Sequence, residues 1–256
     1  MKMTRIIQGT LGRLWTVGVA IALAAATHGA VFTDQGGGVY TATSSGSTSI
    51  PDNNLSGVSF GLSFGDTGLT IADVTVNFTI SGGFNGDLYA YLSQTGGDSL
   101  VLLNRVGRGI TGGSTSLYNN GYNGGGFNNI TLSDAGSVNI HHYDGTTQNI
   151  QPTANGIYLA DGQNISPTSP TSSFNADGGS LTFNSQFFGD DPNGNWTLFF
   201  ADVSSGSSAT LQNWTVTITA VPEPATWAAL CFGAIFGGVQ IVRRVRSRKP
   251  WLGVEC

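Results

Sequence analysis

The chain has 256 residues and a formal net charge of −5 at pH 7, with 38 glycines and only 10% charged residues. Between residues 31 and 221 there are 13 Asp and two Arg but no Lys or Glu, so this part of the chain carries about 11 negative charges. Because proteins contact phosphate through Lys and Arg, this composition excludes a nucleic-acid-binding protein.

The first 30 residues have the pattern of an export signal. Basic residues precede an apolar run over residues 14–26, which is typical of a secretory signal peptide and predicts a short signal helix. Cleavage could follow Ala26, where Ala24 and Ala26 satisfy the small-residue rule, or it could follow Ala30. The exported part is therefore expected to begin near residues 27 to 31.

The exported part has the alternation of β-strands. Residues 31–54 are poor in apolar side chains and predict a flexible lead-in or an edge strand. Within residues 69–80, apolar side chains at every second position predict a strand with one buried face. Further strands are expected over residues 58–62, 88–92, 99–103, 127–132, 138–140, 196–202 and 211–220.

The remaining segments between residues 31 and 220 have no helical period. Residues 105–126 are rich in Gly and Asn and predict a long loop. Many short strands at this spacing indicate an all-β sandwich or barrel. The last two strands are expected to form the core hairpin, with Trp196, Leu198, Leu211 and Trp214 in the core.

Residues 221–249 combine three features. The first is a short proline motif, Val221, Pro222, Glu223 and Pro224. The second is an apolar stretch, residues 225–242, which would make about 27 Å of helix and predicts one transmembrane helix. The third is a basic cluster of Arg243, Arg244, Arg246, Arg248 and Lys249. Basic residues stay on the cytoplasmic side, so residues 250–256 are expected to be a cytoplasmic tail.

This three-part arrangement resembles the PEP-CTERM sorting signal of Gram-negative bacteria. The resemblance implies processing by an exosortase near the Pro-Glu-Pro sequence. It also implies a transient stay in the inner membrane before the protein reaches the cell surface or the extracellular matrix. An ordinary single-span anchor is the alternative. Residues 250–256 extend past the basic cluster, where members of the family usually end sooner.

Residues 55–220 carry a second set of motifs. Gly-x-Trp-x-Leu begins at Gly194, Asp202 follows, and Leu-x-x-Trp begins at Leu211 after a turn. Upstream lies Gly-Asp-Leu, beginning at Gly86. Together these motifs resemble the P domain (P/Homo B domain) of proprotein convertases. The resemblance implies a jelly-roll-like β-sandwich of about eight strands. Gln94 departs from the family pattern, which has Pro at that position.

Aspartates in turns make calcium the leading metal candidate, because Ca²⁺ prefers hard oxygen ligands. The candidate ligands are Asp87, Asp134, Asp190, Asp191 and Asp202. Solvated turn residues are the alternative interpretation. Cys231 and Cys256 both follow the exported part, which therefore has no disulfide and no cysteine ligand for zinc.

Catalytic chemistry is not expected. His141 and His142 are adjacent and would point to opposite faces of a strand, and no Gly-x-Ser-x-Gly sequence is present. Aromatic residues among Asn and Gly suggest either sugar stacking or packing on the sandwich. These residues are Tyr118, Tyr122, Phe127 and Tyr143.

The sequence therefore predicts an exported, non-enzymatic bacterial surface or matrix protein, with a structural or adhesive role in exopolysaccharide or biofilm. The expected partners are an exosortase-type enzyme, the inner membrane and exopolysaccharide. One alternative is an accessory P domain of a secreted subtilisin-like protease system. Another alternative is a glycan-binding module.

Overall fold

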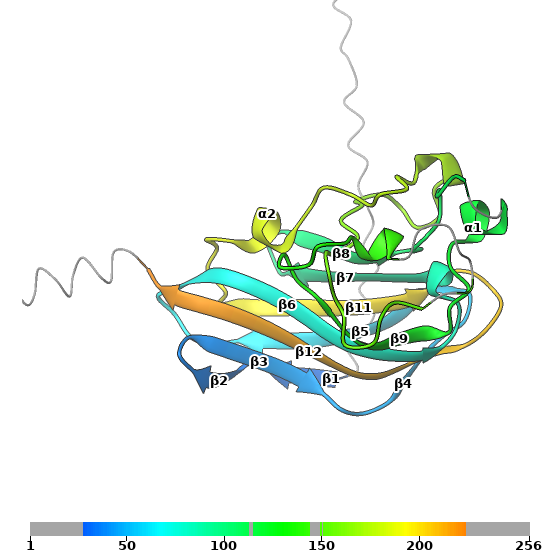
Figure 1. Ribbon diagram of the computed structural model, residues 1–256. Coiled ribbons are helices and arrows are strands. Elements are labelled where there is room, and N and C mark those ends of the chain that lie inside the picture. The colour runs from blue at the N-terminus through cyan, green and yellow to red at the C-terminus, as the bar shows by residue number, and fades with distance from the viewer. Residues whose placement is uncertain (1–27, 113–114, 144–148, 150, 224–256) are drawn as a thin grey trace, which may run out of the picture.

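The computed structural model describes residues 28–112, 115–143, 149 and 151–223, which form two stacked β-sheets (Figure 1). The first sheet has the strand order β1-β5-β11-β7-β8. The second sheet has the order β10-β9-β6-β12-β3-β2, and β4 also pairs with β12. β1 with β5 and β10 with β9 are parallel pairs, and the other pairs are antiparallel.

The strands of the first sheet are β1 (His28–Val31), β5 (Asn54–Phe64), β7 (Leu88–Gln94), β8 (Ser99–Asn104) and β11 (Gly194–Asp202). Those of the second sheet are β2 (Thr33–Gly36), β3 (Val39–Ser44), β4 (Thr48–Ile50), β6 (Leu69–Gly82), β9 (Gly126–Leu132), β10 (Ile157–Tyr158) and β12 (Ala209–Pro222). The helical turns are η1 (Asn85–Asp87), α1 (Thr115–Asn120), η2 (Ile140–His142), η3 (Thr171–Ser173) and α2 (Phe183–Phe187).

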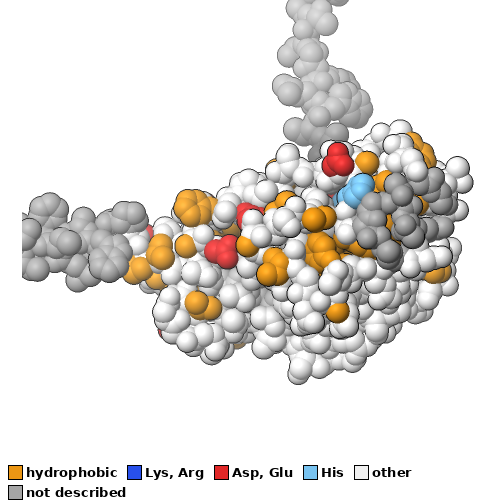
Figure 2. All heavy atoms as spheres, in the orientation of Figure 1, with side chains coloured by type: hydrophobic (Ala, Val, Ile, Leu, Met, Phe, Trp, Pro, Cys, Tyr) orange, Lys and Arg blue, Asp and Glu red, His pale blue; other side chains and the backbone are white. Residues whose placement is uncertain are grey.

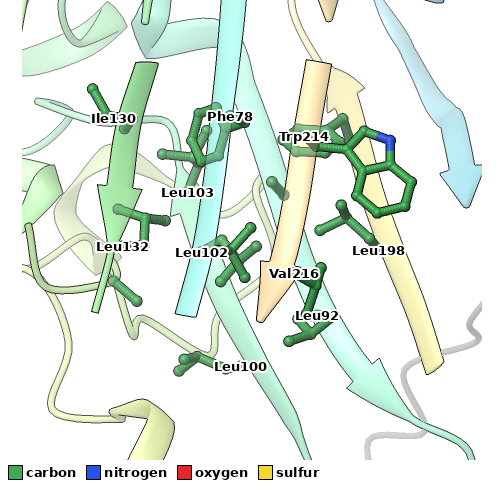
Figure 3. Close-up of a cluster of buried hydrophobic side chains, with 14 of the residues drawn as sticks. Phe78, Leu92, Leu100, Leu102, Leu103, Ile130, Leu132, Leu198, Trp214 and Val216 are labelled. Atoms are coloured by element: carbon green, nitrogen blue, oxygen red, sulfur yellow. The ribbon is translucent and has the colours of Figure 1, made fainter. Parts of the chain in front are cut away.

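The core lies between the two sheets and follows the alternation of the strands. From Val74 to Ile80 in β6 and from Trp214 to Ala220 in β12 every second side chain is buried, as the period of a half-buried strand requires. Figure 3 shows Phe78, Trp214 and Val216 of the second sheet together with Leu92 and Leu198 of the first. The four residues expected in the core are all buried: Trp196, Leu198, Leu211 and Trp214.

The expected core hairpin is wrong, because β11 and β12 belong to different sheets. β11 pairs with β5 and β7, whereas β12 pairs with β6 and β3. The loop over residues 203–208 therefore crosses from one sheet to the other. Trp214 reaches across the core, and its ring centroid lies 5.3 Å from that of Phe60 in β5.

The sandwich has more strands than the eight expected, because residues 28–50 also form strands. β1 extends the first sheet, whereas β2, β3 and β4 belong to the second. β3 lies between β12 and β2, whereas β1 and β2 are edge strands of their sheets, so the edge-strand interpretation holds for those two. The segment expected to be a flexible lead-in or an edge strand thus contributes to both sheets.

Two irregular segments differ in detail from the expectation. The long loop over residues 105–126 contains α1. The strand expected over residues 138–140 is reduced to one bridge between Asn139 and Leu159, after which η2 begins.

The expected signal helix and transmembrane helix both lie outside the described residues. Within the described part of the chain, no helix has the length and apolar character needed to cross a membrane.

Candidate functional site

The start of the expected sorting motif is part of the second sheet. β12 ends at Pro222, and both Val221 and Pro222 are in register with β6. The N–H of Glu223 donates to the carbonyl oxygen of Gly68 at 3.1 Å. A proline fits at the end of a strand, where its missing N–H costs no ladder hydrogen bond. Three of the four motif residues are therefore held against the sandwich.

The rest of the expected signal lies outside the described residues. It comprises Pro224, the apolar stretch 225–242, and Arg243, Arg244, Arg246, Arg248 and Lys249. In Figure 1, β12 ends at the same end of the sandwich as the turn between β5 and β6. No spacer in the sequence separates the last core strand from the motif.

Two of the five aspartates expected to bind calcium meet at the opposite end of the sandwich. Asp87 ends η1 and Asp202 ends β11, and both side chains are buried. Arg105 follows β8, and its Nη2 lies 3.3 Å from Oδ1 of Asp87. Its Nε also donates to the carbonyl oxygen of Gly86 at 3.0 Å. The guanidinium therefore supplies a positive charge to this carboxylate cluster.

Burial controls the ionisation of both carboxyls. Burial raises the pKa of Asp202 to about 7, and the negative charges of Asp87 and Asp52 act in the same direction. The N–H of Ser204 and the charge of Arg105 oppose this rise in the pKa of Asp202. Burial also raises the pKa of Asp87, although Arg105 partly offsets the effect. Asp202 is therefore a carboxyl that titrates near neutral pH.

The other three aspartates lie elsewhere and have different roles. The carboxylate of Asp134 accepts from the N–H groups of Phe183 and Asn184 at 3.0 and 2.7 Å, so it caps the start of α2. Asp191 accepts from the N–H of Asn193 at 2.9 Å in an exposed turn. Asp190 is exposed in the same turn.

These positions do not bring the five aspartates together. In the parts of the chain that the structure describes, no group of three or more His, Cys, Asp or Glu side chains is arranged to hold a metal ion. At Asp87 a protein cation already neutralises the carboxylate. Calcium binding stays a prediction.

A second buried polar cluster surrounds His141, which lies in η2 directly after the strand expected over residues 138–140. Nδ1 of His141 lies 2.7 Å from Oδ2 of Asp161, and Nε2 lies 2.8 Å from the carbonyl oxygen of Arg108. The carbonyl oxygen of Arg108 can only accept, so Nε2 carries a proton, and the ionised Asp161 accepts from Nδ1, which also lies 3.1 Å from Nε2 of Gln163. Gln163 donates to the other oxygen of Asp161 at 3.0 Å. His141 and Asp161 therefore form a buried ion pair.

The ionisation of His141 follows from this pairing. Burial by itself lowers the pKa of the imidazole, but the charge and hydrogen bond of Asp161 outweigh it, so the pKa of His141 is raised. The cluster joins η2 to β8, because the N–H of Asn104 also donates to Asp161 at 3.1 Å. No local pattern in the sequence relates these residues, so sequence reasoning missed Asp161, Gln163 and Arg105.

The aromatic residues expected to stack on sugars are partly in the core. Tyr122 and Phe127 are buried, so their faces are closed to a glycan. The ring of Tyr143 lies 4.2 Å from that of Tyr122, and Tyr118 is half-buried. Packing on the sandwich is therefore the correct interpretation for Tyr122 and Phe127.

Comparisons with known proteins assign no family to this chain. No protein-family model and no curated protein matches it. Two solved structures are similar to it: the serine protease of Aeromonas sobria, and the complex of that protease with the chaperone ORF2. Each is 16% identical in sequence to this chain, with a TM-score of 0.34. The similar region covers 70% of this chain but only 26% of the chain in the solved structure.

Proposed function

We propose that this chain is an exported, non-enzymatic protein of the bacterial surface or extracellular matrix. An exosortase-type system would sort it, and its role would be structural or adhesive in exopolysaccharide or biofilm. The position of the Val-Pro-Glu-Pro motif carries the proposal. The motif begins with the last two residues of β12, and the apolar and basic segments follow it in sequence.

The surroundings of the histidines support a non-enzymatic role. Both ring nitrogens of His141 are engaged within the protein, and its side chain is buried. It has no free nitrogen that could accept a proton from a substrate. His142 is half-buried and has Nδ1 3.3 Å from the carbonyl oxygen of Ala176.

Mass spectrometry of the mature protein in host membrane, surface and matrix fractions tests the sorting proposal. We expect the surface and matrix forms to end near Pro224, without the basic cluster that starts at Arg243. An intact C-terminal segment in those fractions would overturn the proposal.

A matched pair of variants makes the same measurement specific to the motif. Glu223→Ala changes the motif, whereas Asp191→Ala removes an exposed carboxylate at the same end of the sandwich. We expect the Glu223 variant to stay unprocessed in the membrane fraction and the Asp191 variant to be processed like the wild type. Equal processing of both variants would contradict a role for Glu223 in recognition.

A further inference from the structure

Two exposed apolar side chains lie at the end of the sandwich where the described chain finishes. Phe188 is 64% exposed and Val221 is 45% exposed. The backbone segments that carry them are joined through β6, because the N–H of Gly189 donates to the carbonyl oxygen of Ile71 at 2.8 Å and Ile71 pairs with Ala220. We call Phe188 and Val221 the exit patch. Figure 2 shows apolar side chains at this end of the molecule among others spread over the same face.

The exit patch lies close to the apolar stretch along the chain. The hydrogen bond from Glu223 to Gly68 fixes the chain to the body of the sandwich. Only Pro224 separates Glu223 from Ala225, where the apolar stretch begins. Two residues span at most about 7 Å. If residues 225–242 enter a bilayer, this end of the sandwich must lie at the bilayer surface.

We propose that the exit patch is a membrane-contacting surface, with Phe188 inserted between neutral phospholipids at the outer face of the inner membrane. The inference rests on the proposed function, because it requires the apolar stretch to span that membrane. Contiguous exposed apolar surface is unfavourable in water and favourable at the boundary between headgroups and acyl chains. This contact orients the uncut protein so that the end of the sandwich where β12 finishes faces the bilayer.

The acidic residues near the exit patch favour phospholipids with neutral headgroups. Asp190 and Asp191 follow Phe188 in the chain and are exposed, and Glu223 follows Val221. The two arginines among the described residues, Arg105 and Arg108, follow β8 and bind Asp87 and Thr171, so they do not neutralise these carboxylates. Anionic headgroups would repel the acidic rim, so neutral headgroups fit it better.

Fluorescence quenching in nanodiscs of phosphatidylcholine tests the contact with the full chain. The native cysteines are removed by Cys231→Ala and Cys256→Ala, and a small fluorophore is attached at Phe188→Cys. The matched control carries the same label at Leu55→Cys. Leu55 is 57% exposed, and β5 places it at the opposite end of the sandwich. Both positions are on the surface, and unchanged melting temperatures will show that both labelled chains are folded.

We expect lipids with a shallow nitroxide to quench the label at position 188 and to leave the label at position 55 bright. Equal brightness of both labels, with the chain retained in the disc, would overturn the contact while leaving the sorting proposal standing. Quenching of both labels would show a sandwich lying on its side and would also overturn it. Release of the chain by alkaline wash would refute the membrane span, and the contact with it.

Discussion

At the scale of single residues, Asp202 is the group whose charge bears most directly on stability. It is fully buried at the end of β11, and its Oδ2 has no hydrogen-bond partner among the described residues. Burial raises its pKa from 3.8 to about 7. The folded state therefore favours the protonated carboxyl, and the charged form at higher pH destabilises the fold.

The pH dependence has a definite direction. A pKa raised on folding contributes stability that is complete below about pH 4 and is lost as the pH rises through about 7. For Asp202 the raised pKa sets an upper limit of roughly 4 kcal/mol, and solvent screening makes the effect smaller. We expect Asp202→Asn to raise the melting temperature at pH 8 and to change it little at pH 4. The raised pKa of His141 acts in the same direction, so part of the slope remains in this variant.

Thermal unfolding monitored by circular dichroism between pH 4 and 9 checks this expectation. Asp98→Asn serves as the control, because Asp98 is exposed in the turn between β7 and β8. A pH profile of Asp202→Asn that coincides with that of the wild type would show that Asp202 is not the group that titrates.

The two core tryptophans differ in one hydrogen bond, and this difference is measurable. Nε1 of Trp196 donates to the carbonyl oxygen of Pro192 at 2.9 Å, whereas the buried Nε1 of Trp214 has no partner among the described residues. We expect either Trp→Ala change to cost about 3–5 kcal/mol. Trp196→Phe should cost about 1 kcal/mol more than Trp214→Phe, because only the former loses a hydrogen bond. Urea denaturation gives both differences, and the opposite order would contradict this account.

At the scale of elements, the segment before β5 is integral to the sandwich. β3 covers one side of β12, and β1 covers one side of β5. Phe32, Tyr40, Ala42 and Ile50 add buried apolar side chains to the core. Without this segment, β12 would expose a long row of unpaired backbone groups at its edge.

A chain that begins at Pro51 should therefore lose cooperative unfolding and aggregate, whereas one that begins at His28 should melt like the full exported part. Differential scanning calorimetry and size-exclusion chromatography measure both properties. Equal melting temperatures for the two chains would contradict this role and would support the prediction that the segment is a flexible lead-in.

At the scale of the whole molecule, the positions of the strongly alternating strands were predictable from the sequence, but their partners were not. Alternation is a local property, so β6, β7 and β12 follow from the spacing of their apolar residues. Whether the chain turns back within one sheet or crosses to the other depends on the loop and on distant strands. The loop at 203–208 does not reveal that choice, so the hairpin prediction failed.

The polar clusters were hidden for the same reason. Asp87 and Arg105, like His141 and Asp161, are separated in sequence and meet only after the strands and loops have assembled. Their residue types are ordinary in turns, so nothing local marks them as partners. The expected sorting motif is of another kind, because that prediction rests on a contiguous sequence and not on residues that the fold brings together.

β12 has a mechanical consequence. Together with β6 it is the longest strand, with 14 residues, and it lies between β6 and β3 with its last residue at the chain exit. Hydrogen bonds in an antiparallel ladder run perpendicular to the strands. Tension applied through the C-terminal end therefore loads the bonds to both neighbours in shear, all at once, instead of opening them one by one. Separating β12 from its neighbours should therefore need a larger force when the protein is pulled along the strand than when it is pulled across the strand.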